Sequence, residues 1–438
     1  MPIGAIIPMV LLMAGVHWYL WKRLVRDVSR PGGWYRRAGT GLLVALPLLA
    51  IMATTGGEFG VPFGVQRVVG WPGFYWYAAL LYLVLTLLVS EPIRFAVLRR
   101  ARRAAAERQA EPVAEPVAEP VAEPVPVGTA AGPAAPAVPP APAGEGGGDG
   151  GDSPEPAGGP DAAGLRRRVL LARGVAVGAG TVTAGLLGYG SWAARNLTTK
   201  HVTVPLAKLP RAGHGYRIAV VSDIHLGPVA GRSHCQRVVD AVNATQPDLI
   251  AVVGDLVDAE VDDLRSAAAP LAQLRSRDGA YFVTGNHEYR VGPREWLEHV
   301  AELGLRPLEN ARDELAHFDL AGVNDEDGKG TDFGGPDYEA ALGDRDRRRA
   351  TVLMAHQPVQ IHEAVDHGVD LQLSGHTHGG QMWPVTYLAG LANPTLAGLE
   401  RYGDTQLYVT RGAGAWGPPV RIGADPDITV VELASRQS

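Results

Sequence analysis

Three apolar stretches in the first 100 residues constrain this chain most, because runs of that length need either a lipid bilayer or a very large buried core. They occupy residues 3–21, 41–52 and 74–89. The first and third are about as long as a bilayer crossing requires, roughly 17 to 25 residues, whereas the second is short and contains Pro47. All three are apolar on every side and have Trp, Tyr or Arg near their ends. We therefore predict three transmembrane helices within an N-terminal membrane region, residues 1–103.

Basic residues are distributed unevenly around these stretches. Residues 22–37 hold six Lys or Arg side chains, whereas residues 54–71 hold only Arg67. Five more arginines lie in residues 94–103, after the third stretch. Since loops rich in Lys and Arg stay in the cytoplasm, both basic segments are predicted to be cytoplasmic.

A fourth crossing is indicated at residues 174–192, a weakly apolar, Gly-rich stretch preceded by Arg166, Arg167 and Arg168. Basic residues before it and few after it predict a helix that leads from the cytoplasm to the exterior. The run Arg-Arg-Arg-Val-Leu-Leu also resembles a twin-arginine export signal, here in an internal position. We therefore interpret residues 165–198 as a twin-arginine-like segment and a fourth transmembrane helix, which places the rest of the chain outside the cytoplasm.

Residues 104–164 have a composition of their own. They contain the repeat Glu-Pro-Val-Ala, which starts at Glu111, followed by runs of Ala, Pro and Gly. Such a segment buries too little apolar surface to offset the loss of chain entropy, so it is predicted to be a disordered linker. Binding of a partner through the repeat is the alternative.

Charge and cysteine content exclude some classes of protein. The net charge is -6 at pH 7, which disfavours a dedicated nucleic-acid partner, since such proteins normally carry a basic domain. Cys235 is the single cysteine, so an intrachain disulfide and a cysteine-based zinc cluster are both excluded.

Residues 199–438 alternate short runs rich in Val, Ile and Leu with amphipathic segments, a pattern typical of a layered α/β domain. Strands are predicted at residues 217–222, 248–253, 280–284, 318–323, 351–355, 369–374, 406–410 and 428–433. Helices are predicted at residues 233–245, 262–274 (bent at Pro270), 293–303 and 358–366.

Polar residues directly follow five of these strands. In order, the chain reads Asp-Ile-His, Gly-Asp, Gly-Asn-His-Glu, His-Gln-Pro and Gly-His-Thr-His after the strands. Since ligands of layered α/β domains bind at the ends of the strands, we expect these side chains to converge on one site. The residues are Asp223, His225, Asp255, Asn286, His287, His356, His376 and His378.

This mixture of side chains suits metal ions. Imidazole and carboxylate groups bind zinc, iron and manganese, with the amide oxygen of Asn as a weaker ligand. The spacing of His376 and His378 puts both rings on one face of a regular strand, and a tight loop there lets them reach two neighbouring ions. Two ions roughly 3.5 to 4 Å apart clamp the attacking and leaving oxygens when phosphate esters are cleaved. A carboxylate must bridge such ions, and Asp255 is the candidate.

The five motifs, in this order, resemble the calcineurin-like metallophosphoesterase superfamily over residues 216–434. The run Gly-His-Thr-His-Gly-Gly-Gln-Met-Trp-Pro, which starts at Gly375, is further similar to a bacterial branch of membrane-linked or exported phosphodiesterases. The resemblance implies a four-layer αββα sandwich with two mixed sheets.

The resemblance also implies two divalent metal ions (Mn, Fe or Zn) and a role for each site residue. His287 would not bind metal; it would stabilise charge on the phosphoryl oxygens and protonate the leaving group, which suits an imidazole because this group titrates near neutral pH. The implied ligands are Asp223, His225 and His378 for one ion and Asn286, His356 and His376 for the other, with Asp255 and a hydroxide bridging the two.

Residues next to the motifs are given supporting roles. Asp258 and Glu288 are adjacent to predicted ligands, and orientation or capping is favoured for them over direct coordination. Residues 382–391 follow the last motif and are either a core strand or an apolar lip that meets lipid.

These inferences predict a multi-pass membrane protein with an extracytoplasmic phosphoric ester hydrolase domain. A phosphodiester, of lipid or envelope origin because of its proximity, is favoured as the substrate over a monoester. One alternative is a phosphomonoesterase or protein phosphatase, but serine/threonine phosphatases have an Arg-Gly pair where this chain has Ala259-Glu260. The other is a non-catalytic metal-binding membrane assembly or sensor protein, which the intact ligand set and His287 disfavour. The oligomeric state is left open.

Overall fold

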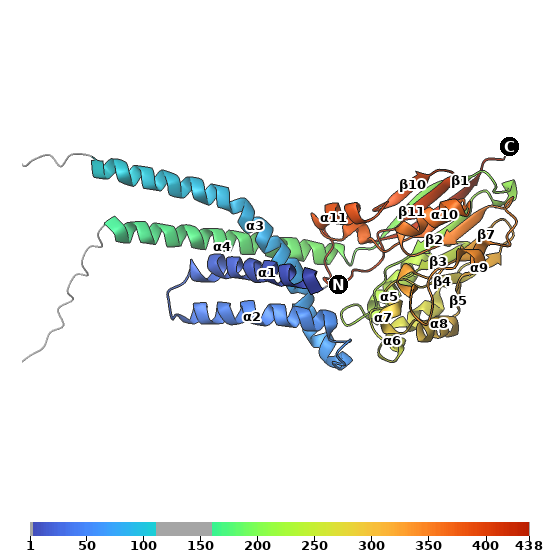
Figure 1. Cartoon of the computed structure of the whole chain (residues 1–438), viewed down its shortest axis with the longest axis horizontal. Helices are drawn as coiled ribbons and strands as arrows, with labels where there is room; N and C mark the ends of the chain where they lie inside the picture. Colours follow the sequence, from blue (N-terminus) through green and yellow to red (C-terminus); the bar gives the residue numbers. More distant parts are fainter. Residues whose placement is uncertain (1–2, 111–159, 438) are drawn as a thin grey trace, which may run out of the picture.

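The computed structural model describes residues 3–110 and 160–437, and its N-terminal part is helical (Figure 1). Trp34–Thr55, Phe63–Ala101 and Arg167–Ala193 are long and apolar enough to cross a membrane. The segment predicted at 41–52 therefore belongs to a longer helix, while a crossing by the first helix stays a prediction. The helices are α1 (Ile3–Leu20), which continues into a π-helical turn η1 (Trp21–Arg26), α2 (Trp34–Thr55), α3 (Phe63–Ala110) and α4 (Pro160–Ala193).

The predicted linker is shorter at both ends than the sequence indicated. Helix α3 continues to Ala110, and α4 begins at Pro160, so both helices extend into the range predicted to be disordered. Residues 111–159, which hold the Glu-Pro-Val-Ala repeat, lie outside the described residues.

The four helices form a bundle with the α/β domain at one end (Figure 1). The connection between α1 and α2 and the basic C-terminal part of α3 lie at the opposite end. Helices α3 and α4 are joined near the domain by a hydrogen bond of 2.7 Å between the hydroxyls of Tyr75 and Ser191. Both predicted cytoplasmic segments are thus remote from the α/β domain.

The α/β domain contains two six-stranded sheets. Both sheets are mixed, because β12 runs antiparallel to β2 in the first, and β10 and β6 are antiparallel to their neighbours in the second. The first sheet has the spatial order β1 (Thr198–Leu206), β12 (Asp427–Ser435), β2 (Tyr216–Val221), β3 (Leu249–Val253), β4 (Ala280–Val283), β5 (Leu305–Pro307). The second has the order β10 (Gly398–Tyr402), β11 (Thr405–Val409), β9 (Leu371–Ser374), β8 (Thr351–Met354), β7 (Asp319–Gly322), β6 (Ala311–Glu314).

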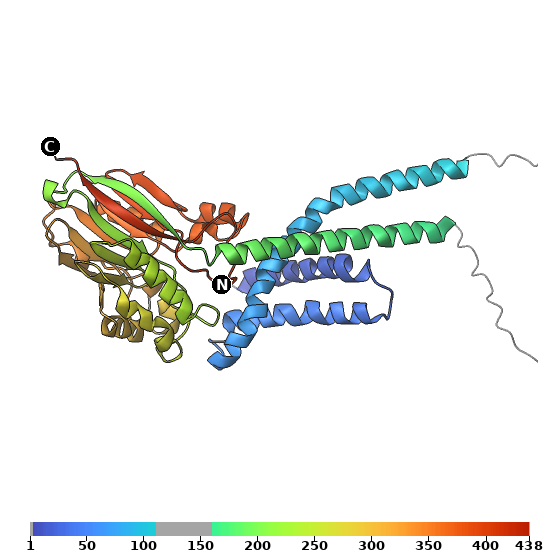
Figure 2. The same ribbon diagram turned by 180° about the vertical axis from the view of Figure 1, so that it is seen from behind.

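The sheets pack face to face, and helices cover both outer faces (Figure 2). Both faces of the first sheet are covered because apolar side chains point alternately to its two sides. In β2, Ile218 and Val220 pack into the core between the sheets, whereas Ala219 and Val221 pack against helices. The four-layer αββα sandwich is therefore confirmed. The helices of the domain are α5 (Arg232–Ala244), α6 (Val261–Ala268), α7 (Glu288–Val291), α8 (Pro293–Glu302), α9 (Tyr338–Leu342), α10 (Ile361–Asp366) and α11 (Val385–Ala392).

All eight predicted strands are present, but β1, β5, β6 and β10 were missed. Strands β5 and β6 have only three and four residues, and β10 is largely exposed, so none of them forms an apolar run. The helix predicted at 262–274 is divided: α6 is followed by a 3₁₀ segment (Ala269–Gln273), because Pro270 has no amide hydrogen with which to continue the helix.

The interpretation of residues 382–391 as a core strand is wrong. The segment forms α11, none of whose residues is buried. Its large apolar side chains are strongly exposed, at 69% for Tyr387, 67% for Leu388 and 86% for Leu391. An apolar helix without protein cover on a water-soluble surface is unfavourable, which supports the alternative of an apolar lip.

Candidate metal centre

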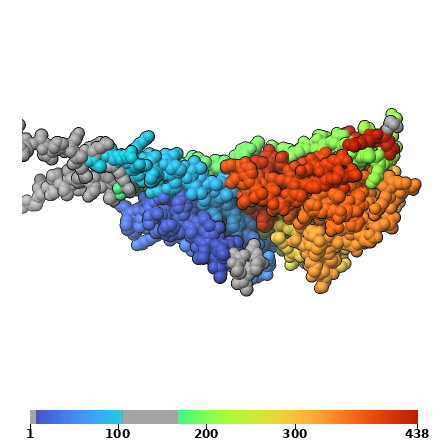
Figure 3. Space-filling model, turned by 45° about the horizontal axis from the view of Figure 1, so that its top comes forward, coloured from blue at the N-terminus to red at the C-terminus, as the bar shows by residue number. Residues whose placement is uncertain are grey.

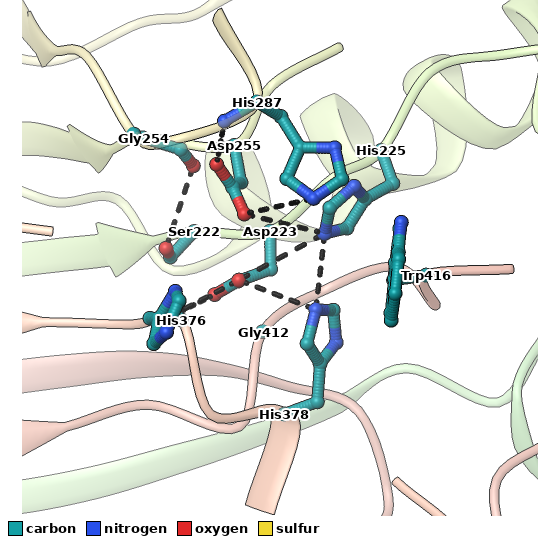
Figure 4. Close-up of polar contacts among 12 residues, drawn as sticks. Ser222, Asp223, His225, Gly254, Asp255, His287, His376, His378, Gly412 and Trp416 are labelled. Atoms are coloured by element: carbon teal, nitrogen blue, oxygen red, sulfur yellow. Dashed lines mark hydrogen bonds and ion pairs between the residues drawn. The ribbon is translucent and has the colours of Figure 1, made fainter. Parts of the chain in front are cut away.

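The predicted site residues come together at the carboxyl ends of five strands from both sheets. Each follows its strand within a few residues, so the two sheets deliver their polar loops to the same edge of the sandwich. Figure 4 shows the labelled histidine and aspartate side chains directed toward one common space. The residues are Asp223 and His225 after β2, Asp255 after β3, Asn286 and His287 after β4, His356 after β8, and His376 and His378 after β9.

Five of these residues have a left-handed backbone that only glycine adopts without strain. Their φ angles are 53°, 50°, 50°, 71° and 52° for Asp223, His225, Asp255, His376 and His378. Each such residue costs roughly 1 to 3 kcal/mol, and this kind of strain persists where the surrounding structure dictates the conformation. Its concentration at one edge is typical of a ligand-binding site.

The first cluster consists of Asp223, His225 and His378, all buried. The Nε2 atoms of the two histidines are 3.0 Å apart, and His378 Nε2 lies 3.4 Å from Asp223 Oδ1. The backbone N–H of His376 donates to both oxygens of Asp223, which fixes this carboxylate between β2 and the last loop.

The second cluster consists of Asp255, His356 and His376, with Asn286 beside it. His356 Nε2 lies 3.3 Å from Asp255 Oδ2, and Asn286 Oδ1 lies 2.9 Å from His376 Nδ1. Asp255 Oδ2 is also 3.7 Å from His225 Nε2 of the first cluster. The carboxylate of Asp255 thus lies between the two clusters, as the bridging position requires.

The spacing of the donor atoms fits bound cations. Ligand atoms about 2.0 to 2.2 Å from one ion are roughly 3.0 to 3.5 Å apart. The 3.0 and 3.4 Å separations in the first cluster and the 3.3 Å separation in the second lie in this range, whereas His225 Nε2 and Asp223 Oδ1 are 3.9 Å apart. His356 Nδ1 is hydrogen-bonded to the carbonyl oxygen of Val253 at 2.8 Å, so its Nε2 is the free ligand atom. That buried Nε2 has no hydrogen-bond partner in the described part of the chain, and such an atom is costly unless it binds a metal or a proton.

The charge states of the histidines divide into two groups. Burial lowers the pKa of His376 to about 4, and burial followed by the charge of Arg421 holds the pKa of His378 well below its usual range. These rings are therefore neutral and ready to bind metal at pH 7. Burial opposes ionisation of His356, but Asp255 raises its pKa well above the usual value. Metal binding at this position therefore displaces a proton.

Asp258 orients two histidines at once. Its Oδ1 accepts a hydrogen bond from His225 Nδ1 at 2.8 Å and lies 2.7 Å from His287 Nδ1, as an ion pair. These three side chains also form a group that could hold a metal ion, but a hydrogen bond and an ion pair explain the short distances without one. The predicted supporting role of Asp258 agrees with this geometry, which leaves Nε2 of both rings directed toward the clusters.

Glu288 and Arg421 hold the loops that carry the clusters. The buried Glu288 carboxylate accepts from the backbone N–H groups of Asp255, Leu256 and Gly285, as its predicted supporting role requires. The buried Arg421 guanidinium donates to the carbonyl oxygens of His378, at 2.7 Å, and Gly414. Arg421 was not among the predicted site residues, because its partners are backbone carbonyls that no residue pattern reveals.

Two aromatic neighbourhoods were also missed. The ring of Trp416 meets that of His287 edge to face at 5.7 Å. Trp71 and Phe74 of α3 line a cavity together with His225 and Asp258. Neither was detectable from sequence spacing, because these contacts arise only when distant segments dock.

An αββα sandwich with paired His/Asp clusters at its strand ends defines a metal-binding α/β class of protein. The sequence profile of the calcineurin-like phosphoesterase family matches residues 216–380. An uncharacterised metallophosphoesterase of Aquifex aeolicus is 34% identical over 55% of this chain and 93% of its own length. One of Bacillus subtilis is 30% identical over 62% of this chain and 98% of its own. The chain belongs to the calcineurin-like phosphoesterase family.

Relatives with membrane segments are also similar to this chain. A transmembrane protein with metallophosphoesterase domain from Danio rerio is 40% identical over 58% of this chain and 61% of its own length. The match to its Bos taurus counterpart is 40% identical and covers 56% of that protein, so this chain spans little more than half of these relatives. Among solved structures, a dimetal phosphatase from Danio rerio aligns with a TM-score of 0.31 and 12% identity over 46% of this chain and 88% of its own.

Replacement of Asp255 by Asn should reduce metal content more than replacement of Asn286 by Ala. Asp255 lies between both clusters, whereas Asn286 borders only the second. We expect Asp255→Asn to lose most of both ions and Asn286→Ala to keep one, as measured by elemental analysis of the purified chain after dialysis. Two tightly held ions in Asp255→Asn would exclude it as the bridge.

Proposed function

We propose that this chain is a membrane-anchored phosphoesterase that hydrolyses a phosphodiester at a centre of two divalent ions, Mn, Fe or Zn. The observation that carries the proposal is the joint presence of two complete clusters and of His287, all directed toward one space. A protein that only binds metal needs no separate proton donor beside its ligands. When bound, two such ions make hydroxide available near neutral pH and offset the charge of the phosphoryl oxygens.

The ligand roles follow from the clusters. In this proposal Asp255 would contact both ions, and its amide N–H and that of Leu256 donate to Glu288. Asp223, His225 and His378 would hold one ion, and Asn286, His356 and His376 would hold the other.

His287 is proposed as the general acid. With its Nδ1 beside Asp258 Oδ1 at 2.7 Å, the ring presents Nε2 to the site, 3.9 Å from Asp255 Oδ2. In this role His287 would transfer a proton from Nε2 to the departing oxygen. Water supplies the hydroxide that joins phosphorus, the phosphorus–oxygen bond to the leaving group breaks, and an alcohol and a phosphomonoester result.

The hydrogen bonds of the nearby Arg421 guanidinium favour a diester over a monoester as the substrate. The buried Arg421 guanidinium donates hydrogen bonds to the carbonyl oxygens of His378, Arg411 and Gly414. It is therefore not directed at the additional charge that a monoester dianion carries.

The position of the basic segments supports an extracytoplasmic catalytic domain. Residues 22–37 and 94–103 lie near the end of the helix bundle remote from the domain. Since such segments resist translocation, the domain is proposed to face the exterior, where lipid or envelope phosphodiesters are the nearest substrates.

Hydrolysis of bis(4-nitrophenyl) phosphate by the purified full chain should depend entirely on added Mn²⁺, Fe²⁺ or Zn²⁺. In the proposed reaction the nucleophile is hydroxide that the metal ions make available. The assay compares this diester with 4-nitrophenyl phosphate, before and after exhaustive chelation, and we expect the diester to be cleaved faster. Activity that survives chelation, or a monoester cleaved faster than the diester, would contradict the proposal.

His287→Ala should lower turnover by roughly 10² to 10⁴, the usual contribution of a positioned acid, and leave the metal content near normal. A diester with a leaving group of low pKa, which needs no proton, should restore much of the rate. Turnover is followed with 4-nitrophenyl and alkyl leaving groups, and metal content by elemental analysis. Loss of both ions would make His287 a ligand instead.

Reporters fused at two positions test the orientation. An enzyme reporter active only outside the cytoplasm should be inactive when inserted at Arg30 and active after Ser438, because basic loops stay inside. The reciprocal cytoplasmic reporter serves as the control. A cytoplasmic signal at Ser438 would reverse the orientation and remove the argument for an envelope substrate.

A further inference from the structure

A cavity of about 310 Å³ lies where the membrane helices meet the catalytic domain, and it adjoins the metal centre. From the catalytic domain its lining includes His225 and Asp258, which belong to the site just described. From the membrane part its lining includes Trp71 and Phe74 of α3. The space beside the metal ligands is therefore bounded by a helix outside the α/β domain.

A second cavity, of about 420 Å³, continues this space along α3. It shares Trp71, Pro228 and Val229 with the first cavity and adds Val68, Arg67 and Gly64 from the first turns of the helix. The two cavities thus form one groove, defined here as the α3 groove, that leads from His225 to the start of a candidate membrane span.

Close packing holds α3 in this position. A Cβ atom on Gly70 would lie 3.4 Å from Val229 Cγ2, and one on Gly417 would lie 3.6 Å from the Phe74 ring. Phe63, the first residue of α3, packs against the core beneath the first sheet. The wall that α3 contributes therefore lies close to the loops that carry Val229 and Gly417.

The chemistry of the α3 groove suits an amphiphile with an anionic group. Trp71, Phe74, Val68 and Val229 provide apolar and aromatic walls. Three cations also line it, Arg195 and Arg237 in the first cavity and Arg67 in the second. A soluble, fully polar diester would leave the apolar walls without a partner, whereas an alkyl or acyl chain would fill them.

A second surface places this part of the domain at the bilayer. The exposed apolar helix α11 lies beside α3, and the carbonyl oxygen of Trp383, just before α11, accepts a hydrogen bond of 2.9 Å from Tyr82 Oη. Tyr82 is within the apolar run of α3, so α11 lies at the level of that run. Figure 3 shows the orange-red surface of this C-terminal region directly against the light-blue surface of the membrane helices.

We infer that α3 forms one wall of the substrate site and that the α3 groove binds the acyl or alkyl chain of a bilayer phosphodiester whose phosphate lies at the metal centre. The inference rests on the proposed function and names the substrate class as a membrane amphiphile. Trp71 and Phe74 are the residues that determine this specificity, and lipid enters from the apolar run of α3 that begins at Phe74.

Chain-length dependence tests the inference with the full chain in detergent. The substrates are 4-nitrophenyl ethyl phosphate and 4-nitrophenyl dodecyl phosphate below its micellar concentration, which share one leaving group. For the wild type, kcat/KM should be at least about tenfold higher for the dodecyl ester, since burial of two methylene groups alone is worth about that factor. In Trp71→Ala/Phe74→Ala this ratio should fall toward one, mainly through KM, whereas Trp71→Phe should retain most of it.

Trp34→Ala is the matched control, because Trp34 is an exposed aromatic residue at the far end of the bundle. It should keep the chain-length ratio of the wild type. A wild-type ratio near one, an unchanged ratio in the double variant, or an equal loss in Trp34→Ala would overturn the inference.

Binding separates this inference from the proposed function. Isothermal titration of the wild type should show dodecyl phosphate bound at least about tenfold more tightly than ethyl phosphate, and the double variant should lose the difference. If neither 4-nitrophenyl ester is cleaved but dodecyl phosphate still binds more tightly than ethyl phosphate, the proposed function is contradicted and alkyl-chain binding in the α3 groove is supported. If both 4-nitrophenyl esters are cleaved but dodecyl phosphate binds no more tightly than ethyl phosphate, the inference about the α3 groove is contradicted and the proposed function is not.

Discussion

The buried carboxylate of Asp255 is the constraint on which the rest of the site depends. It lies within 4 Å of a histidine nitrogen from each cluster and also accepts the backbone N–H of His287 at 2.9 Å. Such close approach requires glycine in the loops after β3 and β4: a Cβ on Gly285 would lie 2.4 Å from Asp255 Oδ1, and one on Gly254 would lie 2.6 Å from the Gly285 nitrogen. The Gly-Asp and Gly-Asn pairs in the sequence are thus steric requirements of one carboxylate placed between two clusters.

The residue pattern was sufficient to predict a layered α/β domain and the convergence of the site because both depend on short-range order, whereas the four-layer sandwich was implied by the family resemblance. Apolar runs become buried strands, and the residue after a strand lies at the sheet edge whatever the details of packing. Asp223, Asp255 and His356 could therefore be assigned to one place before the sheets were known. Their individual metal roles came from family resemblance, since spacing alone does not determine which ion a histidine reaches.

Features that depend on docking between distant segments could not be predicted. Residues 382–391 are apolar in either a strand or a helix, and only their position beside α3 distinguishes a core element from an exposed lip. The cavity wall formed by Trp71 and Phe74 could not be predicted for the same reason. Those residues satisfy the pattern of a membrane helix near the interface, and nothing in that pattern indicates that the same side chains face a catalytic site.

The contacts of α4 bear on whether the membrane part is only an anchor. Arg421 donates its backbone N–H to the carbonyl oxygen of Gly190 in α4 at 2.9 Å, while its guanidinium holds the carbonyl oxygen of His378. One residue therefore links a membrane helix to a proposed metal ligand. Cleavage of the chain after Trp192 would remove the covalent connection of α3 and α4 to the domain and leave only non-covalent contacts such as this one. A released domain would retain both clusters, but it would lose the α3 wall and with it the basis for selecting a membrane substrate.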